Sequence, residues 1–181
     1  MKNKRFAILT IFAAIIIVLQ ILSTYINFGG FSITLTLIPI VIAGAVYGPY
    51  VGMLMGLVFG IIVDIMVILG LDPSGATMFA ARPIITVSTC LVKGGLAGLF
   101  GALSYKYIKN NRVGIIISAI ITPITNTFIL ALSLILFFES SFASAMLMFM
   151  SINFILELLL NALISPGLVN LINRAKSRDI Q

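Results

Sequence analysis

Long apolar stretches alternate with short polar breaks along the whole chain of 181 residues. A helix that crosses a hydrocarbon core of roughly 30 Å needs about 20 apolar residues. The pattern therefore predicts an all-α integral membrane protein with six transmembrane helices, which form a single domain over residues 1–181. The approximate bounds of the predicted helices are 6–22, 34–47, 50–69, 84–105, 113–138 and 142–172.

The breaks between these helices carry local signals of their own. Proline lacks an amide hydrogen and disfavours helix in the residue before it, so Gly48-Pro49 predicts a tight turn between the second and third helices. Residues 23–32 and 70–83 are rich in glycine, proline or small polar residues and predict two outer loops. The basic and then apolar start resembles a signal peptide. No small-residue cleavage site follows it, so we expect a retained first helix.

The composition excludes several classes of protein. Hydrophobic residues make up 61% of the chain and charged residues only 9%, whereas soluble globular proteins have about 25% charged residues. The chain has one cysteine, Cys90, and no histidine, which excludes disulfides, Cys/His metal sites and histidine acid–base catalysis. No Lys-Ser/Thr pair follows the glycines of 94–98, so we expect no ATP hydrolysis by this chain. We predict no enzymatic activity and no cofactor.

The basic residues predict the orientation of the chain. Cytoplasmic segments of membrane proteins carry an excess of lysine and arginine, and six helices would place both termini and the 106–112 connection on one side. That side would hold nearly all the basic residues and leave Arg82 near the outer side and Lys93 within a helix. The net charge of +6 is then explained by topology, and we expect no nucleic-acid binding. The residues on the cytoplasmic side would be Lys2, Lys4, Arg5, Lys106, Lys109, Arg112, Arg174, Lys176 and Arg178.

Two helices carry stripes of small residues. Gly52, Gly56 and Gly60 recur every four residues, which permits close approach of another helix backbone. This stripe indicates either packing within the chain or a homodimer face. On the first helix, the small residues Ala7, Thr10 and Ala14 share one face, which could contact helices of this chain or of another protein.

Polar residues inside the predicted helices are the candidate site residues. Asn153, Glu157 and Asn161 lie at i, i+4 and i+8 and therefore share one helical face, and Asn126 offers a companion on the preceding helix. Such a face is untenable against lipid. It indicates either an interhelical hydrogen-bond network or a substrate-binding surface, and we predict that these four residues bind substrate.

A charge inside the bilayer costs at least about 2.5 kcal/mol on insertion scales, which makes intramembrane charges functional candidates. Asp64, Lys93 and Glu157 are the three charged residues in this position. Asp64 could pair with Lys93, and Asp72 with Arg82, as structural contacts. Alternatively, Asp64 and Glu157 could form a proton relay, as intramembrane carboxylates do in pumps.

Several segments together resemble a known family of membrane proteins. The run Ile38-Pro-Ile-Val-Ile-Ala-Gly-Ala-Val-Tyr-Gly-Pro-Tyr50-Val-Gly52 and the run Leu91-Val-Lys93-Gly-Gly-Leu-Ala-Gly98 look like those of an S component, the substrate-binding subunit of an energy-coupling-factor (ECF) vitamin transporter. Leu35-Thr-Leu-Ile-Pro39, Gly70-Leu-Asp-Pro73 and Met78-Phe-Ala-Ala-Arg-Pro83 are most similar to the pantothenate-type proteins. Folate, riboflavin and thiamine S components share the same layout.

The resemblance implies a transport subunit in a bacterial plasma membrane. It implies high-affinity capture of a vitamin on the outer side, in a pocket built from the last three helices and the outer loops. The vitamin would be delivered by toppling of the subunit when it is docked to a transmembrane coupling protein with two cytoplasmic ATPases. In the family an Ala-x-x-x-Ala element on the first helix meets the coupling protein. Here only Thr10 to Ala14 keeps that spacing, and we expect Ala7, Thr10 and Ala14 to form the docking face.

The outer loop at 23–32 is expected to take part in ligand binding. It should close over the ligand, with Gly29-Gly30 providing backbone freedom and with apolar and polar surface from Tyr25, Asn27, Phe28 and Phe31.

A pantothenate carboxylate needs a cation, and Arg82 and Lys93 lie roughly 16 Å apart along one helix, too far for both to hold it. We expect Arg82 to make this contact, because its guanidinium can grip a carboxylate in bidentate fashion near the membrane surface. The rival hypotheses are a stand-alone proton-coupled carrier that uses Asp64 and Glu157 and a scaffold protein without a ligand.

Overall fold

The computed structural model describes residues 2–25, 27–28, 31–32, 35–140, 144, 147 and 151–178. The predicted all-helical class is confirmed for these residues, apart from a pair of two-residue strands. The strands β1 (Asn27–Phe28) and β2 (Phe31–Ser32) pair antiparallel, with Phe28 opposite Phe31. The described helices are α1 (Lys2–Tyr25), α2 (Leu37–Tyr47), α3 (Pro49–Ile68), α4 (Pro73–Ala81), α5 (Pro83–Tyr107), α6 (Asn111–Phe137) and α8 (Ile152–Arg178).

Four of the described helices are long and apolar enough to cross a membrane, namely α3, α5, α6 and most of α8. The apolar part of α1, Ala7–Ser23, and the helix α2 are shorter. Helix α8 begins at Ile152, ten residues after the start predicted for the last helix. Between 141 and 150, only residues 144 and 147 are described.

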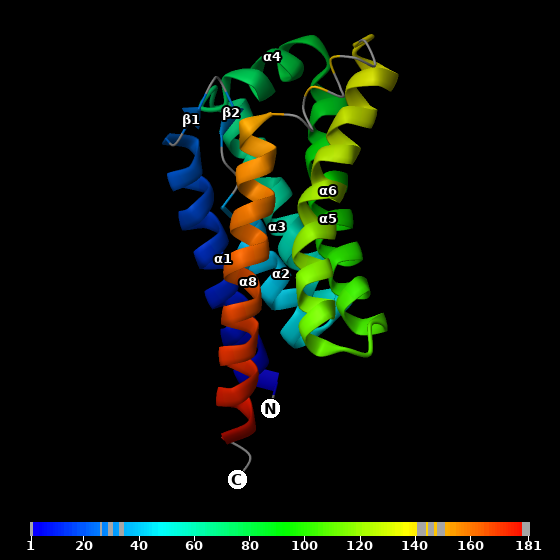
Figure 1. Cartoon of the computed structure of the whole chain (residues 1–181). Coiled ribbons are helices and arrows are strands. Elements are labelled where there is room, and N and C mark those ends of the chain that lie inside the picture. Colours follow the sequence, from blue (N-terminus) through cyan, green and yellow to red (C-terminus); the bar gives the residue numbers. More distant parts are fainter. Residues whose placement is uncertain are drawn as a thin grey trace.

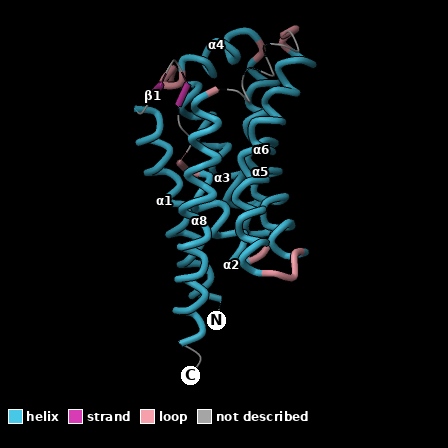
Figure 2. The backbone as a smooth tube through the Cα atoms, in the orientation of Figure 1, coloured by secondary structure: helices cyan, strands magenta, loops and turns pink. Residues whose placement is uncertain are grey.

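The elements divide the molecule into two ends (Figure 1). The N and C termini and the connection between α5 and α6 lie at one end, which we call the terminal end. Helix α4 and the β1–β2 pair lie at the opposite end, which we call the cap end. The backbone trace in Figure 2 shows the long helices running between these two ends.

The turn between α2 and α3 depends on the backbone freedom of one glycine. Gly48 has φ of 100°, a conformation that side chains with a Cβ rarely adopt, and its N–H donates to the Gly44 carbonyl at 2.9 Å. Pro49 follows at the first helical position of α3, where its missing N–H costs nothing. The chain therefore reverses within one residue, as the sequence predicts.

The segment 70–83 is more ordered than the predicted loop, because it contains helix α4. The Asp72 carboxylate caps this helix by accepting hydrogen bonds from the Gly75 N–H at 3.2 Å and the Ser74 hydroxyl at 2.8 Å. Pro73 occupies the first turn. The Asp-Pro-Ser-Gly sequence, which indicates a break in a long helix, is thus also the start signal of a short one.

Helices α3 and α5 pack with their backbones in direct contact along the glycine stripe. Gly56 lies against the backbone of Gly94, and a Cβ added to Gly60 would lie 2.6 Å from the carbonyl oxygen of Cys90. A Cβ added to Gly52 would lie 2.5 Å from the carbonyl oxygen of Gly98. Packing within the chain, one of the two interpretations of this stripe, is therefore confirmed.

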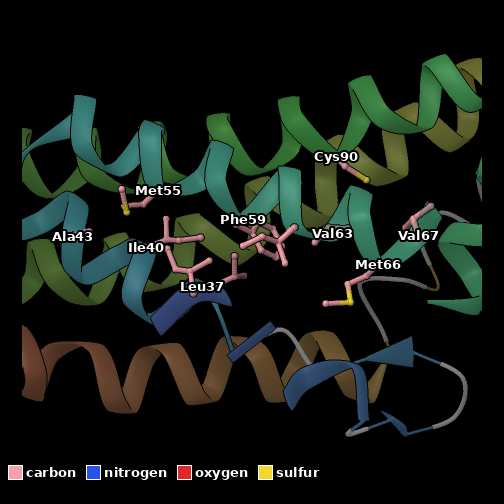
Figure 3. Close-up of a cluster of buried hydrophobic side chains, with 11 residues drawn as sticks. Leu37, Ile40, Ala43, Met55, Phe59, Val63, Met66, Val67 and Cys90 are labelled. Atoms are coloured by element: carbon pink, nitrogen blue, oxygen red, sulfur yellow. The ribbon is translucent and has the colours of Figure 1, made fainter. Parts of the chain in front are cut away.

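The main apolar core follows α2 and α3 (Figure 3). Phe59 is the largest of its fully buried side chains, and Leu37 and Ile40 of α2 pack into the same cluster. Cys90 joins the cluster from α5 and lies above Val63 in Figure 3. This core supports the wall from which Phe59 and Val63 face the cavity described below.

Candidate functional site

A cavity of about 410 Å³ lies between the long helices, reaching toward α4. This volume lies in the range of small-molecule sites. Of the described side chains that line it, ten are polar or charged and five are apolar, so the cavity suits a ligand with several polar groups. The lining residues are Gln20, Phe59, Val63, Asp72, Ser74, Lys93, Asn126, Thr127, Leu130, Ser144, Leu147, Ser151, Asn153, Phe154 and Glu157.

One wall of the cavity carries a buried cation. Lys93 of α5 is only 9% exposed and lines the cavity together with Phe59 and Val63 of α3. Its Nζ lies 5.9 Å from the centre of the Phe59 ring, a cation–π arrangement. A buried ammonium group needs a negative partner, and this wall presents the ammonium to whatever occupies the cavity.

Asp64 lies behind this wall rather than in it. The side chain is buried on α3 beside Cys90 and Lys93 and is not among the residues that line the cavity. Its Oδ1 has no hydrogen-bond partner among the described residues. Asp64 is therefore close enough to Lys93 to act on it electrostatically, while Lys93, unlike Asp64, also lines the cavity.

A second, polar wall of the cavity comes from α6 and α8. Asn126 of α6 and Asn153 and Glu157 of α8 are all buried and all line the cavity. Oδ1 of Asn126 accepts no hydrogen bond from any described residue. The amides can donate and accept, and the carboxylate can accept from a hydroxyl or amide group, so this wall suits a ligand with several hydrogen-bonding groups.

Asn161 continues the same stripe but lies beyond the lining of the cavity. Its side chain is fully buried, and Nδ2 donates to the backbone carbonyl of Glu157 at 3.0 Å. The i, i+4 spacing explains this contact, since residues four apart are neighbours on a helix. Asn161 therefore lies one helical turn after Glu157 and hydrogen-bonds the backbone carbonyl of that residue.

Like Asn161, the predicted site residue Arg82 is not among the residues that line the cavity. It stands between α4 and α5, where the chain leaves one helix and enters the next, and its side chain is exposed. Lys93, eleven residues further along α5, faces the cavity instead. The geometry thus favours Lys93 over Arg82 as the contact for an anionic ligand.

Several lining residues were not predicted as site residues, among them Gln20, Asp72 and Ser74. Gln20 of α1 accepts a hydrogen bond from the Thr36 hydroxyl at 2.9 Å, which ties α1 to the start of α2. In the sequence, Gln20 could have been noticed as a single amide in an otherwise apolar helix. Asp72 and Ser74 line the cavity from the capped start of α4, in a segment for which the sequence predicts a loop.

The predicted lid residues can be placed only by their backbone. The β1–β2 pair brings 27–28 and 31–32 together at the cap end, and the side chains of Tyr25, Asn27, Phe28 and Phe31 lie outside the described part of the chain. Closure of this loop over a ligand stays a prediction.

The small-residue face of α1 points away from the bundle. Ala7, Thr10 and Ala14 are all exposed, and the large apolar residues Ile11 and Val18 between and beyond them are exposed as well. Ile16 and Gln20 on the other side of α1 are buried against the bundle. The face is thus available to lipid or to a partner helix.

Comparison with known proteins gave one match. A family model described as "ECF transporter, substrate-specific component" matches residues 4–169, which is most of the chain. No curated protein and no solved structure matches.

Proposed function

The chain belongs to the family of ECF transporter substrate-specific components, and we propose that within this family it captures pantothenate on the outer side of a bacterial plasma membrane. Members of the family are transport subunits rather than enzymes. They bind a small molecule and work with an ECF module of membrane and ATPase subunits. The chain is accordingly a multi-pass membrane protein that takes part in transport.

The observation that carries the choice of ligand is the division of charge in the cavity. Lys93 comes from α5, and the polar residues Asn126, Asn153 and Glu157 come from α6 and α8. Pantothenate has one carboxylate, one amide and two hydroxyl groups. Its carboxylate would contact Lys93, and its hydroxyl and amide groups would face the polar wall, where Glu157 accepts from a hydroxyl group. The opposite placement would bring the ligand carboxylate against that of Glu157.

Six membrane spans with both termini in the cytoplasm form part of the proposal. The basic connection at 106–112 and both chain ends lie at the terminal end in Figure 1, in support of this orientation. The cavity reaches toward the cap end, where Asp72 and Ser74 line it. The cap end would therefore face outward, and a vitamin would enter beneath α4 and the β1–β2 pair.

Binding to the purified protein tests the ligand directly. A ligand that binds only the folded state stabilises it by RT ln(1 + [L]/Kd), about 2.7 kcal/mol at 100 times Kd. We expect pantothenate to raise the thermal unfolding temperature in detergent. Folate, riboflavin and thiamine at the same excess over protein should leave it unchanged. Stabilisation by one of these three instead would replace pantothenate, and uptake into liposomes driven by a pH gradient alone would favour the proton-coupled carrier.

Docking to the coupling protein is proposed for the exposed face of α1. Ala14→Trp would add bulk at one end of the face formed by Ala7, Thr10 and Ala14, where close helix approach needs small residues. We expect vitamin uptake by the assembled transporter to fall at least about tenfold, while vitamin binding to the isolated subunit stays unchanged. Uptake with radiolabelled vitamin and binding by calorimetry separate the two.

The matched control for this prediction is Ile15→Trp. Ile15 is also exposed on α1, but it is turned about 100° from Ala14. Uptake should survive this change. Equal loss of uptake in both variants, or normal uptake in Ala14→Trp, would contradict docking through the Ala7–Thr10–Ala14 face.

A further inference from the structure

A row of buried polar side chains continues beyond the cavity toward the terminal end, where α6 packs against α8. We call this row the polar ladder, and each of its members is at most 1% exposed. We propose that the polar ladder binds ordered water molecules, which hydrogen-bond α6 to α8 just beyond the cavity. The site does not depend on which ligand the cavity holds. The members of the ladder are Ser118 and Thr122 of α6 and Asn161 and Ser165 of α8.

Antiparallel packing places the ladder residues of the two helices at matching heights. Helices α6 and α8 run in opposite directions between the two ends of the molecule (Figure 1). On the cap side of the ladder, Asn126 of α6 and Glu157 of α8 line the cavity together. On the terminal side, Ile115 of α6 and Val169 of α8 belong to one buried apolar cluster. Between these levels each helix advances by three or four residues per turn, which brings ladder residues of the two helices opposite each other. The two rungs are Thr122 opposite Asn161 and Ser118 opposite Ser165.

The serine hydroxyls of the ladder differ from other hydroxyls within the long helices. The usual arrangement is donation to a backbone carbonyl one turn earlier, as the Ser104 hydroxyl does to Gly101 at 2.7 Å and the Thr122 hydroxyl to Ser118 at 2.8 Å. The hydroxyls of Ser118 and Ser165 make no hydrogen bond with any described residue, and Oδ1 of Asn161 accepts none. A buried polar group inside a membrane is costly without a partner, so these three groups need one.

Two prolines add hydrogen-bond acceptors at the same level. Pro123 lies inside α6 and Pro166 inside α8. Because proline has no N–H, the carbonyls of Ala119 and Ala162, four residues earlier, lose their usual helical donor. The ladder therefore combines two hydroxyls with several oxygens that can only accept. Water suits such a set, because it donates two hydrogen bonds and a buried water makes about three in all. None of the four side chains of the ladder carries a charge, so a metal cation there would lack a counter-charge.

The surroundings of the ladder indicate how water reaches it. On the α5 side, Gly101 packs so closely against the Thr122 hydroxyl that a Cβ would not fit between them. On the terminal side, the cluster that contains Ile115 and Val169 is apolar and buried. Toward the cap end the next residues are Asn126 and Glu157, which line the cavity. Water would therefore enter from the cavity and occupy its inner end.

Magnetisation transfer from water in solid-state NMR tests the proposal on the unmodified protein. The full chain, labelled at serine and reconstituted in lipid bilayers without vitamin, gives one transfer rate for each serine side chain. Ser133 is the matched control, because it is buried on the same helix but pairs with the Thr89 hydroxyl at 2.7 Å. Transfer to Ser118 and Ser165 should be at least about threefold faster than to Ser133, since a bound water would touch both. Rates as slow as that of Ser133 would overturn the proposal, and a direct Ser118–Ser165 hydrogen bond would produce that result.

Substitution shows whether the two helices share the bound water. Ser165→Ala removes one partner of the water from α8, so the transfer rate at Ser118 on α6 should fall about twofold or more. Ser133→Ala removes a buried hydroxyl outside the ladder and should leave the rate at Ser118 unchanged. An unchanged rate at Ser118 in Ser165→Ala, or an equal fall in both variants, would contradict a water shared by α6 and α8. Thermal unfolding in detergent reports that each variant is folded, and the rates in the unmodified protein test the site even if one variant is not.

Discussion

In Lys93→Gln protein, the preference for pantothenate over its uncharged alcohol analogue, panthenol, is expected to fall by about tenfold to a hundredfold. A hydrogen bond to a charged group contributes about 1.5–3 kcal/mol, and only the acid gains it from Lys93. Lys93 faces the cavity and lies over the Phe59 ring, where solvent competes little for its charge. The quantity to measure is the ratio of the two dissociation constants, because a general loss of affinity cancels in the ratio.

Arg82→Gln is the matched control for this prediction. It removes the same charge from the exposed break between α4 and α5, outside the cavity, and should leave the ratio unchanged. If Arg82→Gln loses the preference for pantothenate while Lys93→Gln keeps it, Arg82 and not Lys93 contacts the carboxylate. If neither variant loses the preference, the ligand is not recognised as an anion, and the pantothenate proposal fails while membership of the family stands.

Of the polar stripe predicted on the last helix, the structure brings Asn153 and Glu157 to the cavity and leaves Asn161 outside its lining. Helical spacing places Asn153, Glu157 and Asn161 on one face, but spacing cannot say where along that face the cavity ends. The cavity ends at Glu157, and Asn161 hydrogen-bonds the backbone one turn below. Asn126 could be named as a companion because an amide in an apolar helix needs a polar neighbour.

Other differences between prediction and structure arise because one sequence pattern is compatible with two structures. Asp72-Pro73 interrupts a long apolar helix, and the same residues cap and start a short one. The sequence predicts the end of the long helix here but does not predict helix α4. Arg82 and Lys93 both looked available to a ligand, because the direction of each side chain depends on how α5 packs. Close packing against α3 turns Lys93 inward, and no local pattern in the sequence encodes that rotation.

Glycine contacts hold α5 against α3 on either side of Lys93. On α5, Cys90 lies against Gly60 and Gly94 lies against Gly56, so the turn that carries Lys93 is held between two backbone contacts. Gly56→Ala should destabilise the folded protein by about 1–3 kcal/mol or more, because the new methyl group meets the Gly94 backbone and no flexible side chain can move aside. Thermal unfolding in detergent, followed by size-exclusion chromatography, measures this loss.

Gly167→Ala on α8 makes the same chemical change with the opposite expected sign. No described residue lies within 4 Å of a Cβ at Gly167, so alanine should be neutral there or stabilise the helix by about 0.5–1 kcal/mol. If Gly56→Ala were as stable as Gly167→Ala, α3 and α5 could not be in backbone contact. Because α3 and α5 carry Phe59 and Lys93, separation of the two helices should also weaken vitamin binding in Gly56→Ala, even at temperatures where the protein stays folded.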